Sequence, residues 1–251
     1  MNPLDQLIDE PKTETTESKK IRDILYRRSD LSTFVVHLTR NKECLEGILK
    51  SWTIEARNMW GAAKKKLEES QQMVKSQKCV CFTETPLEYL SLLIEKIDGR
   101  NFQPSSYGIA ITKKLARKNG VNPIWYVDMT PGQVKQWALS KAVDNIVHDK
   151  IKDNSLECSN VAKIAPFIEQ MYPGTGNDHP KEFWWEREWR HVGNFNLLGH
   201  ILLLCPGSDF EKFYDLAKVR DPHVKCIDPN WGLEKIIASL AGFENGEIDI
   251  L

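Results

Sequence analysis

The stretch over residues 183–193 constrains the fold more than any other part of the chain, because it packs three tryptophans, two glutamates and two arginines together. Successive side chains of a β-strand point to opposite faces of the sheet, so residues two positions apart share a face. As a strand, this stretch would carry glutamates and an arginine on one face (Glu186, Glu188, Arg190) and mainly aromatic rings on the other (Trp185, Trp189, His191).

A row of carboxylates on one strand face has two interpretations. The carboxylates either line a functional cleft, with Glu188 the first candidate and Glu186 the second, or face water beside neutralising arginines. We expect Arg187 and Arg190 to pair with these glutamates, and phosphate binding is their second interpretation. The tryptophans are expected to anchor the core rather than to stack on nucleic-acid bases.

Short β-rich runs recur along the chain and are separated by helical patterns. They predict strands over residues 33–38, 78–83, 106–111, 123–127, 200–205 and 224–227. Helices are predicted over 41–50, 86–97, 113–118, most of 131–171, 208–218 and 231–243. Asn41 and Thr85 are the expected helix caps, and Pro86 suits a first helical position. Because the strands do not alternate strictly with helices, the pattern favours an α+β fold with a mixed, split β-sheet core and helices inserted between strands.

Three further segments complete the predicted organisation. Residues 1–20 are polar and are expected to form a flexible tail, followed by a short helix and a single domain over 21–251. The charged segment 55–76 is interpreted as a solvated helix or a mobile loop, and 173–178 as a loop. Glu84 is expected only to oppose the dipole of the helix that follows it.

Composition excludes several classes of protein. The 34 Lys and Arg residues nearly balance the 35 Asp and Glu residues, so net charge argues neither for nor against nucleic acid. No apolar run is long enough for a membrane span, and the polar start argues against a secretory signal. The six cysteines are too few for a disulfide scaffold, which favours reduced thiols in the cytoplasm. Cys79 and Cys81 have no partner pair at zinc-finger spacing, so no metal site is predicted.

Polar groups follow or end apolar strands at three places along the chain. His37 and Thr39 end the first predicted strand, Thr83 ends the second, and Glu188 belongs to the late one. Side chains in such positions are held rigidly by the scaffold. A glutamate pair with a histidine could do acid–base chemistry, although His37 could equally be a core histidine bonded to a main-chain carbonyl.

At these residues the chain resembles the ADP-ribosyltransferase fold, including its diphtheria-toxin and poly-ADP-ribose branches. The shared features are an early His-x-Thr (residues 37–39), the Leu-x-x-Ile-Leu helix that follows it (residues 45–49), and a late Glu-x-Glu (residues 186–188). The chain departs from that pattern at Leu38, where the transferases carry glycine, and no Ser-Thr-Ser follows the second strand.

The resemblance implies roles for named residues. Cleavage of the nicotinamide–ribose bond creates an oxocarbenium-like centre, which Glu188 would stabilise while Glu186 orients the acceptor. The other implied NAD-binding positions are His37 for a ribose, the backbone of Leu38 for the nicotinamide amide, Thr39 and Thr83 for hydrogen bonds, and Tyr89 or Tyr107 for ring stacking.

The motifs His-Leu-Thr, Cys-Phe-Thr-Glu-Thr-Pro-Leu, Tyr-Gly-Ile-Ala and Trp-Glu-Arg-Glu-Trp-Arg are also similar to the AbiGi-like family of abortive phage-resistance proteins, over roughly residues 33–243. Together the resemblances imply a cytoplasmic phage-defence protein that transfers ADP-ribose from NAD to a protein or nucleic-acid acceptor. The alternative is a non-enzymatic antitoxin or binding component of an abortive-infection system, with a cognate toxin or antitoxin as its partner. A nuclease built on the glutamate pair is a third hypothesis.

Overall fold

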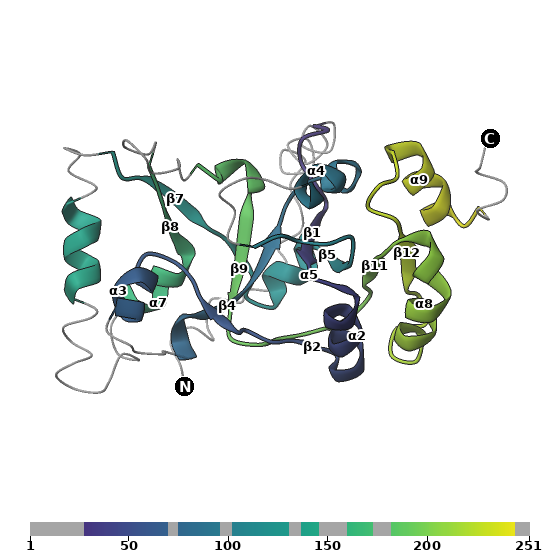
Figure 1. Ribbon diagram of the computed structural model, residues 1–251, viewed down its shortest axis with the longest axis horizontal. Helices are drawn as coiled ribbons and strands as arrows, with labels where there is room; N and C mark the ends of the chain where they lie inside the picture. Colours follow the sequence, from purple (N-terminus) through teal and green to yellow (C-terminus); the bar gives the residue numbers. More distant parts are fainter. Residues whose placement is uncertain are drawn as a thin grey trace, which may run out of the picture.

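An eight-stranded sheet runs through the computed structural model, which describes residues 28–69, 75–95, 102–130, 137–145, 160–172 and 182–243 (Figure 1). The strand order is β12-β11-β5-β1-β4-β9-β6, and β3 also pairs with β4. All pairs are antiparallel except β11 with β12. The strands are β1 (Phe34–Leu38), β3 (Asn58–Met59), β4 (Lys78–Thr83), β5 (Gly108–Thr112), β6 (Asn122–Pro123), β9 (Glu188–Val192), β11 (Leu202–Leu204) and β12 (Lys225–Ile227).

Two short ribbons lie outside this sheet. β2 (Thr53–Ile54) pairs with β10 (Phe195–Asn196), and β7 (Trp125–Asp128) pairs in parallel with β8 (Ile168–Met171). The predicted α+β class with a mixed sheet is confirmed. The predicted split core is not what the structure shows, because β1, β4 and β9 lie side by side in one continuous sheet.

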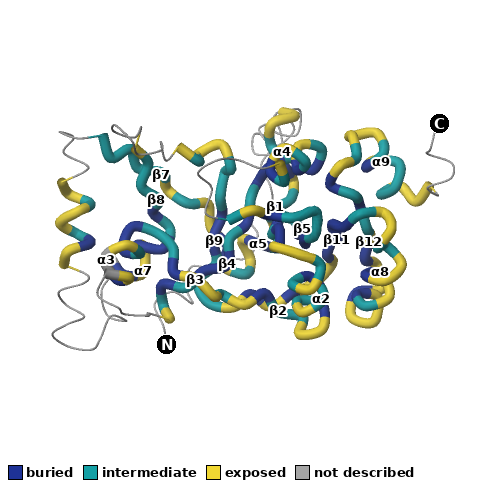
Figure 2. The backbone as a smooth tube through the Cα atoms, viewed as in Figure 1, coloured by how far each residue is buried: buried dark blue, intermediate teal, exposed yellow. Residues whose placement is uncertain are grey.

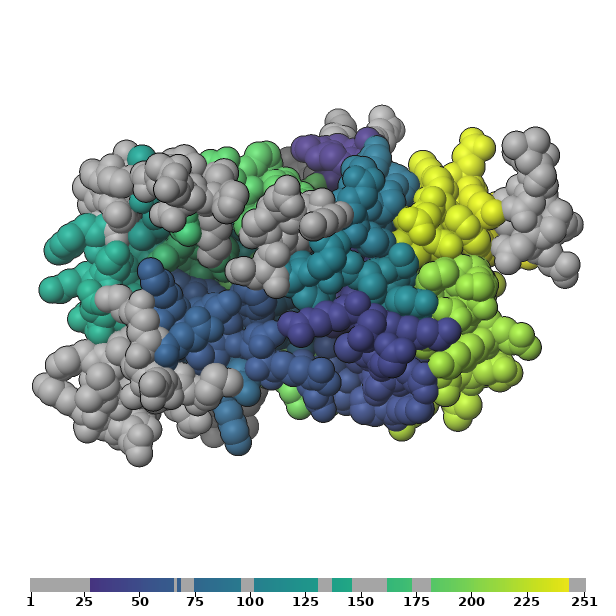
Figure 3. Space-filling view, viewed as in Figure 1, coloured from purple at the N-terminus to yellow at the C-terminus, as the bar shows by residue number. Residues whose placement is uncertain are grey.

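Helices cover both faces of the sheet, and each face has its own apolar cluster. On the side we call the α2 face, α2 (Lys42–Ser51), α5 (Lys113–Lys118) and α8 (Phe210–Lys218) pack on side chains such as Val35 and Phe82. On the opposite α4 face, η3 (Leu87–Tyr89), α4 (Leu90–Ile94) and α9 (Leu233–Ala241) pack on side chains such as Val36 and Leu204. Figure 2 shows the buried strand segments between exposed helix surfaces. In Figure 1, β12, α8 and α9 lie together at one end, where Figure 3 shows the yellow-green and yellow atoms of this part of the chain.

Local sequence explains the first helix and strand. The side chain of Asn41 accepts a hydrogen bond from the backbone N–H of Cys44 at 2.9 Å, which caps α2 as predicted. In β1, Val35 and Val36 are fully buried on opposite faces, because both faces of the sheet are covered. Thr85 does not cap the next helix, since its hydroxyl bonds that of Thr83 at 2.8 Å.

The charged segment 55–76 was predicted as a solvated helix or a mobile loop, and this prediction is wrong for its described part. That part contributes to a third apolar cluster. It forms β3, α3 (Lys64–Glu69) and the start of η2 (Lys75–Gln77), while residues 70–74 lie outside the described part. Met59, Ala63 and Leu67 are buried against residues of α7 (Asn160–Ile164), η5 (Ala165–Phe167) and β8. Charge on the outer side of a short helix therefore concealed an apolar inner side.

The strand predicted over 183–193 is also shorter than expected. Trp184–Glu186 forms a 3-10 turn, η6, and Arg187 has a left-handed backbone with a φ of 48°, so β9 begins only at Glu188. Of the expected aromatic anchors, only Trp189 is buried, whereas Trp184 and Trp185 are 58% and 38% exposed.

The bounds of other strands and helices also differ from the predicted ones. Residues 122–128 form two short strands rather than one, and 168–171 is a strand inside the region predicted as mostly helical. Helices occupy 137–145 and 160–164. The predicted tail, the short helix after it and the 173–178 loop lie outside the described residues. No described helix has the length and apolarity that crossing a bilayer requires.

Candidate functional site

His37 is a core histidine in this structure. Its Nδ1 lies 2.8 Å from the carbonyl oxygen of Cys81, and since a carbonyl only accepts, Nδ1 carries the proton. The ring meets Phe82 edge-on with centroids 5.9 Å apart. Burial lowers the pKa of His37, and the hydrogen bond to Cys81 offsets part of that effect. The imidazole is therefore held neutral between β1 and β4, as in the alternative interpretation of this residue.

His37 and Glu188 lie on opposite faces of the sheet. Directly paired residues of an antiparallel sheet share a face, and the register pairs Val36 with Thr83 and Thr83 with Glu188. Glu188 therefore shares the α4 face with Val36, whereas His37, one residue further along β1, points to the α2 face beside Phe82. The predicted convergence of these two side chains on one cleft is wrong.

Glu188 belongs to a charge cluster centred on a fully buried arginine. Arg190, with a side chain only 1% exposed, donates from Nε and Nη2 to the two carboxylate oxygens of Glu188 at 2.7 and 2.9 Å. It also donates to Glu169 at 2.6 Å and to the carbonyl of Pro166 at 2.7 Å. The backbone N–H of Glu188 donates to the hydroxyl of Tyr126 at 3.1 Å. This confirms the predicted Arg190–Glu188 pair and joins β9 to the third apolar cluster.

The cysteines near this cluster are not activated. Burial, followed by the charge of Glu188, raises the pKa of the Cys81 thiol well above its ordinary value. Burial likewise raises the pKa of Cys79 to about 12, although Arg190 opposes this. Both therefore remain protonated thiols, which are poor nucleophiles and poor metal ligands. Among the described residues, no group of three or more His, Cys, Asp or Glu side chains is arranged to hold a metal ion.

The other predicted NAD-binding residues are dispersed. Thr39 closes the end of β1, since its backbone N–H and its hydroxyl both donate to the carbonyl of Tyr107, at 2.7 and 3.0 Å. The hydroxyl of Tyr107 donates to Asp209 at 2.7 Å, and burial together with this bond raises the pKa of Tyr107 to about 12. Leu38 is buried in the α4-face cluster, and Tyr89 is 46% exposed on η3.

Thr83 and Glu186 are brought together through the main chain. The hydroxyl of Thr83 donates to the carbonyl oxygen of Glu186 at 2.5 Å, which ties the end of β4 to the η6 turn. Glu186 lies in that turn rather than in β9, so it does not form the expected pair of carboxylates on one strand face with Glu188.

Glu84 is the residue that sequence reasoning most underestimated. Its side chain is 11% exposed and accepts hydrogen bonds from Lys113 at 2.9 Å, from Arg187 at 3.3 Å and from the indole N–H of Trp189 at 2.8 Å. Arg187 therefore pairs with Glu84 rather than with the neighbouring glutamates. The three donors come from α5, from β9 and from the turn before β9. All three segments are distant in sequence from Glu84, so no local pattern could reveal this cluster.

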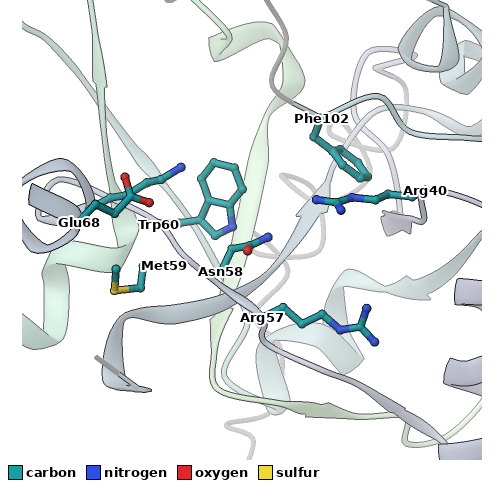
Figure 4. A pocket seen from close by; sticks show the side chains of 8 residues that line it. Arg40, Arg57, Asn58, Met59, Trp60, Glu68 and Phe102 are labelled. Atoms are coloured by element: carbon teal, nitrogen blue, oxygen red, sulfur yellow. The ribbon is translucent and has the colours of Figure 1, made fainter. Parts of the chain in front are cut away.

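A hollow of about 240 Å³ lies beside β3, and none of the predicted site residues lines it. Figure 4 shows Trp60 and Phe102 on opposite sides of it, with the guanidinium group of Arg40 extending beneath Phe102. Arg57, Lys64 and Glu68 also contribute to its lining, together with Asn58 and Met59. A sequence signal existed, because an aromatic residue at position 60 stands between basic residues at 57 and 64.

Comparison with known proteins gives one informative match. Residues 46–218 match the protein family described as "Putative abortive phage resistance protein AbiGi, antitoxin". No curated protein and no solved structure shows a significant match. The matched residues include β4, Glu84 and the Glu188–Arg190 pair, whereas His37 precedes them. Because the match covers more than half of the chain, the protein belongs to the AbiGi family.

Proposed function

We propose that this protein serves phage defence as an antitoxin that acts by binding a cognate toxin, without using Glu188 as a catalytic group. The family description supplies the antitoxin role and, with it, the expectation of a toxin partner. The proposal rests on one structural observation, the placement of His37 and Glu188 on opposite faces of a single sheet.

The surroundings of both residues fit a structural role. A transferase needs its glutamate free to stabilise the positive charge that develops on a ribose. Here Arg190 already engages both oxygens of Glu188, and the imidazole of His37 is engaged with the Cys81 carbonyl. These contacts join strands to one another and to the third apolar cluster, which is what a stable binding scaffold requires.

ADP-ribosyl transfer from NAD to a protein or nucleic-acid acceptor is the rival proposal. Its support is the chain order of the motifs, with His37 early and Glu186 and Glu188 late. It requires a route by which the η6 turn and the Glu188 carboxylate would reach a shared ligand.

Co-expression separates the two proposals. Products of neighbouring genes are tested as the toxin, each produced from an inducible promoter in a bacterial host. We expect the wild-type protein to restore growth and to co-purify with that toxin. Glu188→Gln should do the same, because glutamine keeps the shape of the side chain and one oxygen acceptor for Arg190. Growth and the amount of co-purified complex are the two measurements.

The controls address folding and chemistry separately. Thermal unfolding of Glu188→Gln checks that the variant remains folded, and Glu186→Gln is the matched change in the adjacent turn. If a folded Glu188→Gln variant failed to restore growth, and mass spectrometry found ADP-ribose added to a cellular protein or nucleic acid only with the wild type, transfer would replace binding as the function.

A further inference from the structure

The hollow beside β3 is lined by an excess of positive charge. The lining includes three cations, Arg40, Arg57 and Lys64, and a single carboxylate, that of Glu68. The ion pair of Arg57 with Glu55 at 3.1 Å is exposed on both sides, so water and salt weaken it. Within the described residues, neither Arg40 nor Lys64 has a carboxylate at ion-pair distance. The hollow therefore favours an anionic ligand.

Two aromatic rings form opposite walls of the same hollow, and each carries a cation. The guanidinium carbon of Arg40 lies 5.5 Å from the centre of the Phe102 ring, and Nζ of Lys64 lies 4.2 Å from that of Trp60. Flat rings and guanidinium planes are the surfaces on which nucleic-acid bases stack.

Arg190 and the backbone help to hold Trp60 in place. Arg190 lies 5.7 Å from the centre of the Trp60 ring and is itself fixed by Glu188, Glu169 and the Pro166 carbonyl. The backbone N–H of Trp60 donates to the carbonyl of Gln77 at 3.2 Å. An aromatic wall that is already ordered loses little conformational entropy when a ligand binds.

The size of the hollow limits the ligand. Its volume of about 240 Å³ is below the roughly 300–1,000 Å³ typical of sites for larger ligands. A dinucleotide such as NAD would extend well outside it, whereas one base with its sugar and phosphate is closer to its size.

We propose that this hollow binds a single nucleotide unit, with its base against the rings of Trp60 and Phe102 and its phosphate held by the cations beside those rings, Arg40 and Lys64. The unit is either a free nucleoside monophosphate or one nucleotide of a single strand, and both offer the same chemistry. This activity is additional to toxin binding and does not depend on it. An acidic peptide without aromatic side chains would satisfy the cations, but it would not use the two rings.

The test is calorimetric titration of the full chain with adenosine monophosphate, adenosine, inorganic phosphate and a short single-stranded oligoadenylate. We expect adenosine monophosphate to bind more tightly than either of its halves, and more weakly as salt is raised. If oligoadenylate binds more tightly than the monophosphate, the natural ligand is a nucleic-acid strand. If the monophosphate binds more tightly, the natural ligand is a free nucleotide. Lys64→Gln and Arg40→Gln should each weaken binding about tenfold, the effect of losing one charge-assisted contact.

A matched control lies at the other end of the molecule. Nζ of Lys235 lies 4.9 Å from the ring centre of Trp231, so Lys235→Gln removes the same kind of cation–π contact outside the hollow and should leave binding unchanged. Phe102→Leu tests the stacking wall without altering charge and should also weaken binding. The proposal is overturned if no nucleotide binds saturably, if the Lys64 and Lys235 variants behave alike, or if a peptide of alternating glutamate and tryptophan binds as tightly as the monophosphate.

Discussion

At the residue scale, the most consequential side chains are buried ions whose partners come from distant segments. Glu84 gathers donors from α5 and from β9 with its preceding turn, and Arg190 gathers acceptors from β9, η5 and β8. The residue types in these clusters were visible in the sequence. The sequence did not show which charges would pair, apart from Arg190 with Glu188. The partners in a buried ion pair are set by tertiary packing rather than by spacing along the chain.

Glu84→Ala should lower the free energy of unfolding by about 2 kcal/mol, because it leaves the buried indole N–H of Trp189 without an acceptor and two cations without their carboxylate. Glu84→Gln keeps one acceptor oxygen, so its free energy of unfolding should lie between those of Glu84→Ala and the wild type. Urea unfolding monitored by circular dichroism gives the comparison. Glu88→Ala, a glutamate truncation in the adjacent η3 turn, is the control and should cost much less.

The buried carboxylate of Asp221 should make the folded protein less stable in acid. Burial would raise its pKa, but hydrogen bonds from His200 at 3.0 Å and from the N–H groups of Ile201 and His223 outweigh burial and hold the pKa below 3.8. A carboxylate whose pKa is lower in the folded state stabilises the fold above its unfolded-state pKa, and that contribution is lost as pH falls through the folded-state pKa.

The wild-type protein should therefore exceed Asp221→Asn in unfolding free energy by a steady margin around pH 5, and the margin should shrink as the pH falls below 3.8. Urea titrations of both proteins across that range measure the margin. A margin that widened with acid would mean that another group governs the effect.

At the element scale, strands with buried, β-rich sequence were predictable, and the relation between distant strands was not. β1, β4 and β5 lie within two residues of their predicted bounds because their apolar runs are continuous. The face on which Glu188 lies depends instead on the register Val36–Thr83–Glu188 across three strands. A slip of one residue in that register would place Glu188 on the face of His37, and nothing in either segment alone fixes it.

Alanine substitutions at two glycines, one in β5 and one in α2, should have opposite effects on stability. A Cβ at Gly108 would lie 2.5 Å from the carbonyl oxygen of His37, so Gly108→Ala should push these strands apart and destabilise the protein. Gly47 lies inside α2, where a Cβ would meet no other atom within 4 Å, so Gly47→Ala should stabilise the protein by about 0.5–1 kcal/mol. Differential scanning calorimetry should show melting temperatures that move in opposite directions, and a shift in the same direction would contradict the packing of β5 on β1.

At the scale of the whole molecule, one sheet carries helices on both faces and a third apolar cluster beyond β4 and β9. The side chains expected to form one dinucleotide cleft are divided between the faces, and none of them lines the basic, aromatic hollow formed by Arg40, Trp60, Lys64 and Phe102. The pattern of strands and helices correctly indicated an α+β class with a mixed sheet, and the sequence motifs correctly indicated the AbiGi family. They could not indicate how the sheet distributes polar side chains between its faces, since that depends on long-range pairing.

The central claim, that Glu188 and His37 do not form an NAD site, is tested most directly by calorimetric titration of the wild-type protein and of Glu188→Gln with NAD. The structure predicts that the two proteins give the same heats, because the Glu188 carboxylate is occupied by Arg190 and faces away from His37. Saturable NAD binding by the wild type that disappears in a folded Glu188→Gln variant would contradict it.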